Sequence, residues 1–178
     1  MLDTSAFLAG FDPFSLCEDQ FTVPKVEHEI KANSMSWVRF KTALENGKVK
    51  VKLPSEEYRI RVKESAKKIG DVCFLSETDL HILALASELK TEGYNPQILT
   101  DDYSIQNVAA QLEIEFLSLI TFGISHLLEW VRYCPGCHMN YPDYYKSTTC
   151  GVCGTDLKRK PHRKVKKIKD ARVRKKYF

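Results

Sequence analysis

The sequence predicts an α/β domain with a parallel sheet, followed by a small metal-binding module. Short apolar runs alternate with helical patterns over roughly the first 120 residues, which is typical of a parallel sheet with helices on both faces. Two Cys-x-x-Cys pairs follow this region. Within it, Leu99–Asn107 combines a strand end with a helix start and places Asp101 and Asp102 at the junction. Such corners line the crevice where open α/β sheets bind ligands.

The N-terminal part of the chain predicts a very short strand and two helices. Met1–Asp3 is a candidate strand that ends at an acid, and a solvated terminal Asp3 is the alternative. Pro24 suits the first position of a helix whose opening turns contain Glu27 and Glu29, and acids there suit the helix dipole. Apolar spacing from Ser34 to Gly47 predicts the second helix, with glycine as its stop.

The middle of the chain predicts two strands and two further helices. Residues 48–53 alternate between lysine and apolar residues, which indicates a half-exposed strand with its lysines in water. A helical pattern runs from Ser55 to Gly70, and the apolar run 72–75 is consistent with a buried strand. A capping-box pattern at 76–79 then starts a helix that ends near Gly93.

Residues 96–100, 104–112 and 114–117 predict a strand, a helix and a strand. In a parallel sheet, Asp3, Asp79, Asp101 and Asp102 would then lie at strand or helix ends on one edge. Each acid alone is explained as a helix cap or a solvated residue. Together with Glu29 they form a carboxylate cluster that a cation must neutralise, and all-oxygen ligands favour Mg²⁺ or Mn²⁺.

The cysteine pairs predict a structural zinc site. Cys134 and Cys137 are separated by 12 residues from Cys150 and Cys153, and glycines at 136, 151 and 154 allow tight turns. Four thiolates close a tetrahedral Zn²⁺ site and leave no open position for catalysis. The isolated cysteines, 17 and 73, are expected to be ordinary buried thiols.

Charge is distributed unevenly along the chain. The net charge is +4, but residues 158–178 hold 12 Lys or Arg and one acid, so the preceding 157 residues have a net charge of −7. A basic end beside an acidic body predicts a polyanionic partner. The N-terminus lacks the basic region of a secretory leader, and residues 116–128 are too short and too polar to span a bilayer, so we expect a cytoplasmic protein without a membrane partner.

Aromatic and basic residues in and after the cysteine module are candidate RNA contacts. The tyrosines are expected either to pack on the cysteine turns or to stack on unpaired bases. The basic segment is too poor in apolar residues to fold alone, so residues 158–178 are expected to be disordered when free, and phosphate contact is favoured over a mere solubility role. The candidates are Tyr141, Tyr144, Tyr145, Lys158, Arg159, Lys160, Arg163 and Lys164.

Four segments resemble the PIN-domain nucleases: Leu2–Phe7, Val23–Pro24 with Glu29–Ile30, Ser76–Leu80 and Thr100–Asn107. The order of such a domain and a four-cysteine ribbon resembles the Nin-one-binding endonucleases, which mature the 3′ end of small-subunit ribosomal RNA. The short chain and the direct join to the ribbon resemble the archaeal members. The resemblance implies a PIN-like three-layer domain at 1–122, a linker or helix at 123–130, a zinc ribbon at 131–157 and a basic tail at 158–178.

By the same resemblance, Asp3, Glu29, Asp79 and Asp102 hold one or two Mg²⁺ or Mn²⁺ ions. Asp102 is preferred because such domains present a Thr-x-Asp at this corner, and Asp101 is kept among the catalytic acids as an additional or shared ligand. The metals activate a water and stabilise the phosphate charge, and the expected products carry a 5′-phosphate and a 3′-hydroxyl. No nucleophilic side chain is required.

Hydroxyls and histidines near the acids have subsidiary expected roles. Thr4, Ser5 and Thr100 are candidates to orient waters, and two helix histidines, 28 and 81, are expected to be packed or solvated. The implied partners are precursor small-subunit rRNA and the pre-ribosomal small subunit, with no small-molecule substrate. One alternative is a non-catalytic RNA-binding assembly factor. Another is a toxin-type PIN ribonuclease, and the ribbon and the basic tail argue against this second alternative.

Overall fold

The computed structural model describes residues 1–121, 123–142, 145 and 147–168. Its helices and strands follow one another in the order α1 (Thr4–Leu8), η1 (Pro13–Ser15), β1 (Gln20–Thr22), α2 (Pro24–Glu29), α3 (Met35–Glu45), β2 (Val49–Val51), α4 (Glu56–Ile69), η2 (Val72–Phe74), α5 (Glu77–Thr91), β3 (Gln97–Leu99), α6 (Tyr103–Gln111), β4 (Glu115–Leu117), β5 (His126–Tyr133), β6 (Asn140–Tyr141) and β7 (Lys158–Lys167). None of the described helices is both long and apolar enough to cross a bilayer.

The N-terminal segment joins two pairs of parallel strands into one arrangement. Strand β1 pairs with β2 and β3 pairs with β4, each in parallel. Between these pairs, the Leu2 N–H donates to the Phe21 carbonyl at 2.8 Å, and the Leu99 N–H donates to the Met1 carbonyl at 2.9 Å. Leu2 also forms a parallel bridge with Leu99. Two residues before Asp3 therefore suffice as a minimal central strand, and the carboxyl ends of all five segments face the same edge.

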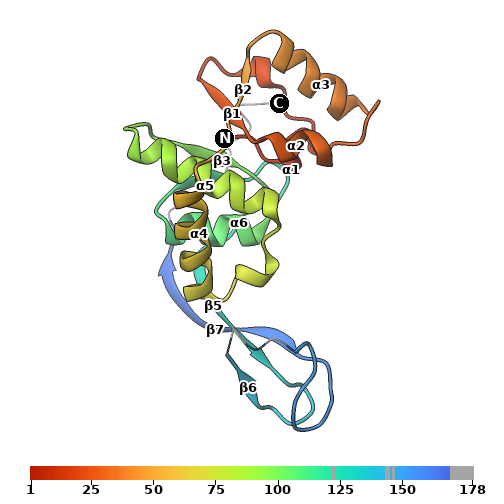
Figure 1. Ribbon diagram of the computed structural model, residues 1–178, viewed down its shortest axis with the longest axis vertical. Helices are drawn as coiled ribbons and strands as arrows, with labels where there is room; N and C mark the ends of the chain where they lie inside the picture. The colour runs from red at the N-terminus through yellow and green to blue at the C-terminus, as the bar shows by residue number, and fades with distance from the viewer. Residues whose placement is uncertain (122, 143–144, 146, 169–178) are drawn as a thin grey trace.

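Helices cover the strands in two groups, as the resemblance implies. Helices α1 and α3 pack together on one side, and α4, α5 and α6 pack together on the other (Figure 1). Phe7 of α1 meets Phe40 of α3 edge to face, with ring centroids 5.3 Å apart. Helix α5 is buried on every side from Leu80 to Ala86, so it is the central helix of the domain.

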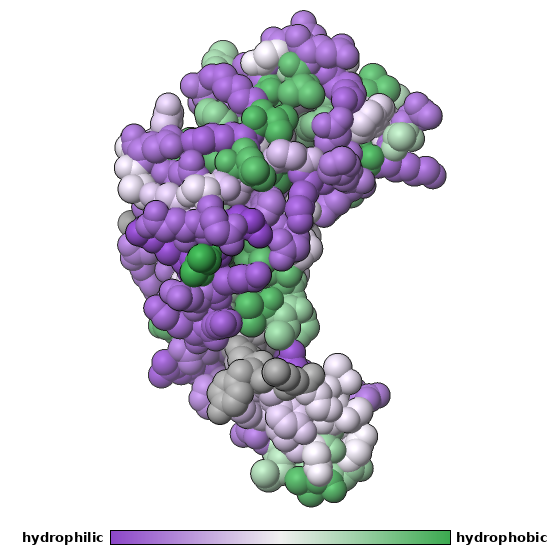
Figure 2. All heavy atoms as spheres, viewed as in Figure 1, coloured by the Kyte–Doolittle hydropathy of each residue, from purple (hydrophilic) through white to green (hydrophobic). Residues whose placement is uncertain are grey.

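The cysteine module is an antiparallel three-stranded sheet with the order β6-β5-β7. It forms a separate, smaller lobe at one end of the molecule (Figures 1 and 2). Strands β5 and β7 pair from His126 with Lys167 to Tyr133 with Lys158. Strand β5 also contacts α4 and α6 of the larger domain, so the ribbon lobe is anchored by a strand that builds it.

Most predicted elements are confirmed, and three segments differ. Residues 72–74 form a 3₁₀ turn instead of a strand, because a short apolar run does not distinguish a buried strand from a packed turn. The segment 123–130, expected to be a linker or a helix, contains the first part of strand β5 (His126–Tyr133). Residues 158–167 form β7, so the expectation of disorder is wrong for this part, and residues 169–178 lie outside the described residues. Backbone pairing to β5 orders a segment that lacks a core of its own.

Candidate active site

Asp3 is the most buried acid of the predicted cluster, with only 4% of its surface exposed. Its Oδ1 accepts the Thr4 N–H at 2.7 Å, and its Oδ2 accepts the hydroxyls of Ser5 at 2.7 Å and Thr100 at 2.8 Å. Burial raises the pKa of Asp3 above its ordinary value, and the three donors oppose this shift. The carboxylate is therefore held in one orientation at the carboxyl edge of the sheet.

Two threonines connect Asp3 to two further acids. Thr4 donates its N–H to Asp3 and its hydroxyl to Glu29 Oε2 at 2.5 Å. Thr100 donates its hydroxyl to Asp3 and accepts the Asp102 N–H at 3.1 Å. Glu29 ends α2, and Asp102 is the N-cap of α6. Acids from three distant parts of the sequence are therefore linked through two threonines, with Asp102 joined by its backbone N–H and not by its carboxylate.

Asp79 is the fourth acid, and its surroundings link it electrostatically to the others. Its carboxylate accepts the Ser76 N–H at 2.7 Å, and its own N–H donates to the Ser76 hydroxyl, which closes the predicted capping box at the start of α5. Burial raises the pKa of Asp79 to about 6, with smaller contributions from the negative charges of Asp3 and Asp102. Asp79 thus caps its helix and also lies within the field of the other carboxylates.

The four carboxylates have no protein cation among them. Within the described residues, none of the four forms an ion pair with a lysine, arginine or histidine. Their oxygens are also spread more widely than the sulfurs of the cysteine module, which form the one tight ligand group of the described residues. Mg²⁺ usually retains several waters and takes only one or two carboxylates directly, so an open acidic set of this kind fits such an ion.

Asp101 points to a different part of the structure. Its Oδ1 accepts the N–H groups of Leu119 at 3.1 Å, Ile120 at 3.1 Å and Thr121 at 2.9 Å, and also the Thr121 hydroxyl at 3.0 Å. Its own N–H donates to Ser5 at 3.1 Å. The adjacent acids therefore divide their roles: the Asp101 carboxylate holds the loop after β4, while Asp102 remains beside the cluster.

The histidines near the acids are placed as predicted, one in solvent and one in the core. His28 is exposed on α2, whereas His81 on α5 is only 4% exposed. Both ring nitrogens of His81 lack a hydrogen-bond partner in the described structure. The desolvation that accompanies burial lowers the pKa of His81, which favours the neutral ring.

Four sulfurs form the second candidate metal centre. The Sγ atoms of Cys134, Cys137, Cys150 and Cys153 all lie within 4.8 Å of one another. Tetrahedral zinc with bonds of about 2.3 Å separates its sulfurs by about 3.8 Å, so this group fits one zinc ion. The remaining cysteines, 17 and 73, are exposed, so the expectation that they are buried is wrong.

The backbone repeats one turn at each cysteine pair. The N–H of His138 donates to the Cys134 carbonyl at 2.9 Å, and the N–H of Gly154 donates to the Cys150 carbonyl at the same distance. Both residues have positive φ, 61° and 73°. Gly136 is required for space, because a Cβ there would lie 2.9 Å from Thr155 Oγ1. The ligand geometry is thus fixed by local turns.

Comparison with known proteins places this geometry in a family. Residues 1–89 match a family model described as the PIN domain of ribonuclease. An endoribonuclease Nob1 of Methanothermobacter thermautotrophicus is 36% identical over 163 residues, or 92% of this chain and 93% of the relative. The Methanocaldococcus jannaschii endoribonuclease Nob1 is 38% identical over 90% of this chain and 76% of its own length. The chain belongs to the Nob1 family of PIN-domain ribonucleases. A ribonuclease VapC1 of Thermoplasma acidophilum is also 36% identical, over 89% of this chain and 76% of that protein.

Both Nob1 matches extend through the cysteine ribbon, which is joined to the nuclease domain by a contact that sequence reasoning missed. Asp71 is completely buried and receives hydrogen bonds from Asn107 Nδ2 at 2.5 Å and from Arg159 Nη1 at 2.7 Å. The Arg159 guanidinium lies 3.8 Å from the ring centroid of Phe74 and 4.0 Å from that of Trp130. We call these five residues the domain joint.

Asn107 and its neighbour Gln106 also fix the chain that leads into the ribbon. Asn107 exchanges two hydrogen bonds of 2.8 Å with the backbone of Leu128. Gln106 donates to the Thr100 carbonyl at 2.9 Å and accepts the Ile124 N–H at 2.9 Å. Both side chains are buried. In the sequence, the available signal was the pair of polar residues within the predicted helix that follows Asp102. Buried polar side chains need hydrogen-bond partners, so such residues are candidates to hold a neighbouring segment.

The predicted RNA contacts have diverse surroundings. The Arg159 side chain is in the domain joint, and Arg163 forms an exposed ion pair with Glu129 at 2.6 Å. Tyr141 contacts Cys150 Sγ at 2.9 Å, and its ring packs on Tyr145 with centroids 4.5 Å apart. These two rings follow the packing alternative. Tyr144 lies outside the described residues, Lys158 and Lys164 of β7 are exposed, and Lys160 is half-buried with its ammonium 4.7 Å from the ring centroid of Tyr133.

Proposed function

We propose that this protein is a metal-dependent endoribonuclease that cuts precursor ribosomal RNA at the 3′ end of the small-subunit RNA. The single observation that carries the proposal is the set of four acids without a protein cation, at the carboxyl edge of a PIN domain that continues into a zinc ribbon. The Nob1 relatives, named as endoribonucleases, match about nine-tenths of this chain. A cytoplasmic protein that acts on pre-ribosomal small subunits fits this assignment.

The proposed catalytic ligands are Asp3, Glu29, Asp79 and Asp102, which would hold one or two Mg²⁺ or Mn²⁺ ions. When bound, these ions supply Lewis-acid stabilisation of the charged phosphate and make a water nucleophilic near neutral pH. Thr4 and Thr100 orient two of the carboxylates from which that water and the phosphate would be held, those of Glu29 and Asp3. No protein nucleophile is involved, and the proposed products carry a 5′-phosphate and a 3′-hydroxyl.

The proposed zinc site plays a structural part. Four thiolates leave no open coordination position, so zinc would hold the ribbon and not take part in the chemistry. Phosphate contacts are proposed for the lysines at 158, 160 and 164, which form no ion pair within the described residues. Binding through such contacts weakens as salt rises, since it releases counterions from the RNA.

Cleavage of a precursor that spans the 3′ end of small-subunit RNA tests the proposal. Zinc-loaded protein freed of other divalent ions should be inactive and should gain activity on addition of Mn²⁺ or Mg²⁺. Asp79→Asn and Asp102→Asn should each reduce cleavage by at least about a hundredfold, while RNA binding persists. Normal cutting by the Asp102 variant would show that the ligand assignment is wrong.

The two alternatives give different results in the same assay. A non-catalytic assembly factor would bind the precursor and leave it intact with either metal. A toxin-type PIN ribonuclease with no role in rRNA maturation would show no preference for the precursor junction, and the match to a relative named ribonuclease VapC1 makes unrelated RNAs a necessary control. We expect one cut, mapped by primer extension, at the precursor junction.

A further inference from the structure

A cavity of about 320 Å³ lies between the nuclease domain and the ribbon. Pockets of this size, at the lower end of the range for small-molecule sites, suit one ring system and not an extended chain. Its walls come from α6, the segment before β5, and strands β5 and β7. The lining residues used below are Tyr103, Trp130 and Lys164.

The cavity begins one residue from the carboxylate cluster. Tyr103 directly follows Asp102, and both lie at the first turn of α6. The orientation of this turn is fixed, because the Asp102 carboxylate accepts the N–H groups of Ser104 at 2.6 Å and Ile105 at 3.4 Å. A polynucleotide strand with one phosphate at Asp102 therefore has a neighbouring nucleotide within reach of the cavity.

The cavity offers an aromatic ring without a partner. Tyr103 is 51% exposed and makes no ring contact or hydrogen bond with the other described residues. Trp130 contributes a second aromatic wall, but Arg159 already covers one face of its indole, and the indole nitrogen lacks an acceptor. An exposed phenol ring beside an indole is the kind of surface on which unpaired bases stack.

The cavity also offers a free positive charge. Lys164 lies on β7 opposite Leu128, and its ammonium group forms no ion pair with any described residue. Its neighbours on the same strand are paired: Arg163 with Glu129 at 2.6 Å and Lys166 with Glu113 at 3.6 Å. An unpaired ammonium at the mouth of an aromatic cavity suits a phosphate group.

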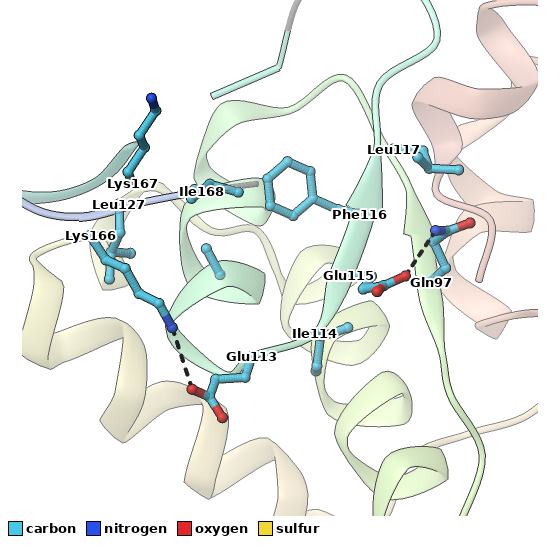
Figure 3. A pocket seen from close by; sticks show the side chains of 11 residues that line it. Gln97, Glu113, Ile114, Glu115, Phe116, Leu117, Leu127, Lys166, Lys167 and Ile168 are labelled. Atoms are coloured by element: carbon cyan, nitrogen blue, oxygen red, sulfur yellow. Dashed lines mark hydrogen bonds and ion pairs between the residues drawn. The ribbon is translucent and has the colours of Figure 1, made fainter. Parts of the chain in front are cut away.

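A larger cavity of about 490 Å³ along β4 does not combine these features (Figure 3). Figure 3 shows Lys166 directed to Glu113 and Gln97 directed to Glu115, so these polar groups of its lining already bond to each other. Its aromatic wall is Phe116, which is 4% exposed. Of these two cavities in the described part of the chain, only the smaller one combines an open aromatic ring with an unpaired cation, and its Tyr103 directly follows Asp102.

We propose that the smaller cavity receives one unpaired nucleotide of the RNA, next to the phosphate that the carboxylates hold. Its base stacks on Tyr103, and its phosphate pairs with Lys164. This proposal rests on the proposed function and specifies it, because it requires an unpaired strand at the cut. A residue of the ribbon thereby helps to position RNA in the nuclease site, and Tyr103 and Lys164 are positioning residues.

The test uses an unpaired uridine octamer with one central 2-aminopurine, whose fluorescence falls when the base stacks. Binding to the zinc-loaded full chain is measured without Mg²⁺ or Mn²⁺, so that the RNA stays intact. Tyr103→Ala should weaken binding by roughly tenfold and abolish the quenching, whereas Tyr103→Phe should retain both. The matched control is Tyr94→Ala, which removes an equally exposed ring (53%) beside a different cavity, with no expected change.

Lysine substitutions form the second arm. Lys164→Ala should weaken binding several-fold and reduce the slope of affinity against salt by about one charge. The control is Lys50→Ala on β2, which is paired with Asp19 at 2.7 Å and is not expected to change either quantity. An RNA duplex of the same length should not be quenched, because its bases are already stacked.

The outcomes separate the cavity from the proposed function. If both Tyr103 variants and Lys164→Ala bind like the wild type while the wild type still cuts precursor RNA, the cavity proposal is wrong and the nuclease assignment stands. If the wild type never cuts RNA but its quenching depends on the Tyr103 ring, the cavity proposal stands and the nuclease assignment falls. Quenching lost equally in Tyr94→Ala would also overturn the cavity proposal.

Discussion

At the scale of single residues, replacing Asp101 or Asp102 by asparagine should have opposite effects on stability and on activity. Asp102 accepts two N–H groups as the cap of α6, and asparagine caps a helix about as well as aspartate. The Asp102→Asn variant should therefore fold normally while it loses the proposed metal ligand. Asp101 instead accepts four donors from Leu119–Thr121, mostly on one oxygen.

Asp101→Asn should lower stability by about 1–3 kcal/mol and keep most of the cleavage activity of the folded protein. The amide replaces a charged acceptor by a weaker one and turns an N–H group toward backbone donors. Urea unfolding of Asp101→Asn and Asp102→Asn, compared with their cleavage rates, checks the division. Full stability together with lost cleavage in the Asp101 variant would make Asp101 a member of the catalytic set.

The raised pKa of Asp79 predicts how stability depends on pH without divalent ions. The folded chain retains this proton up to about pH 6, whereas the unfolded chain releases it at its ordinary pKa of 3.8. The protonated acid thus favours folding below about pH 4, and this contribution is lost as the pH rises through 6. Asp3, whose pKa is also raised, acts in the same direction.

Urea unfolding between about pH 4 and 7 measures this effect as a difference between wild type and Asp79→Asn. The wild type should lose stability relative to the variant as pH rises, and saturating Mg²⁺ should abolish that difference by binding the carboxylate form. Asparagine keeps the capping-box acceptor for the Ser76 N–H, so the comparison isolates the charge. Parallel pH curves would contradict the assigned environment of Asp79.

At the scale of elements, the domain joint shows what sequence patterns leave out. Helix α6 was predicted from its periodicity, but the partner of Asn107 is a strand of the ribbon whose order depends on pairing with β7. The basic composition of Lys158–Lys167 indicated disorder, because composition reports only what a segment buries by itself. The contact of Arg159 with Asp71, 88 positions away, becomes visible only in the folded chain.

The candidate site was more predictable than the joint, for a physical reason. Short strands in parallel must end at one edge, so Asp3 and Asp102 were placed near each other by topology alone, whereas Asp79 follows a 3₁₀ turn and lies in the first turn of α5. The orientation of the acids was not predictable, because the Ser5 and Thr100 hydroxyls hold the Asp3 carboxylate and the Thr4 hydroxyl holds that of Glu29. From the sequence, those hydroxyls were expected to orient water molecules, whereas in the structure they donate hydrogen bonds to carboxylates.

Arg159→Met should destabilise the protein by about 3 kcal/mol, because it leaves the buried Asp71 carboxylate without its cation. The methionine side chain keeps apolar contact with the rings of Phe74 and Trp130, so the comparison isolates the charge. The matched control is Arg163→Met on the same strand, whose pair with Glu129 is exposed and whose loss should cost less than about 1 kcal/mol. Urea denaturation of both variants measures the loss in unfolding free energy. Equal losses in the two variants would contradict a stabilising role for the domain joint.

At the scale of the whole molecule, the joint predicts that the zinc ribbon and the nuclease domain are coupled. The strands that end in the cysteine turns also carry Trp130 and Arg159 to the nuclease domain. Loss of zinc should therefore loosen more than the ribbon lobe. The packing of α1 on α3, on the other side of the strands, involves no residue of the ribbon and should be unaffected.

Cys134→Ser should abolish stoichiometric zinc binding, because the three remaining thiolates hold the ion more weakly. Hydrogen exchange should then accelerate in β5, β7, η2 and the middle of α6, which contact each other at the joint, and stay unchanged in α1 and α3. Cys73→Ser, which changes an exposed cysteine within η2, should alter neither zinc content nor exchange and so controls for local disturbance there.

Because the joint sets how the ribbon sits beside the carboxylates, Cys134→Ser should also cut precursor RNA more slowly, even at saturating Mg²⁺. Unchanged exchange in η2 after zinc loss would mean that the two domains fold independently and that the joint transmits nothing.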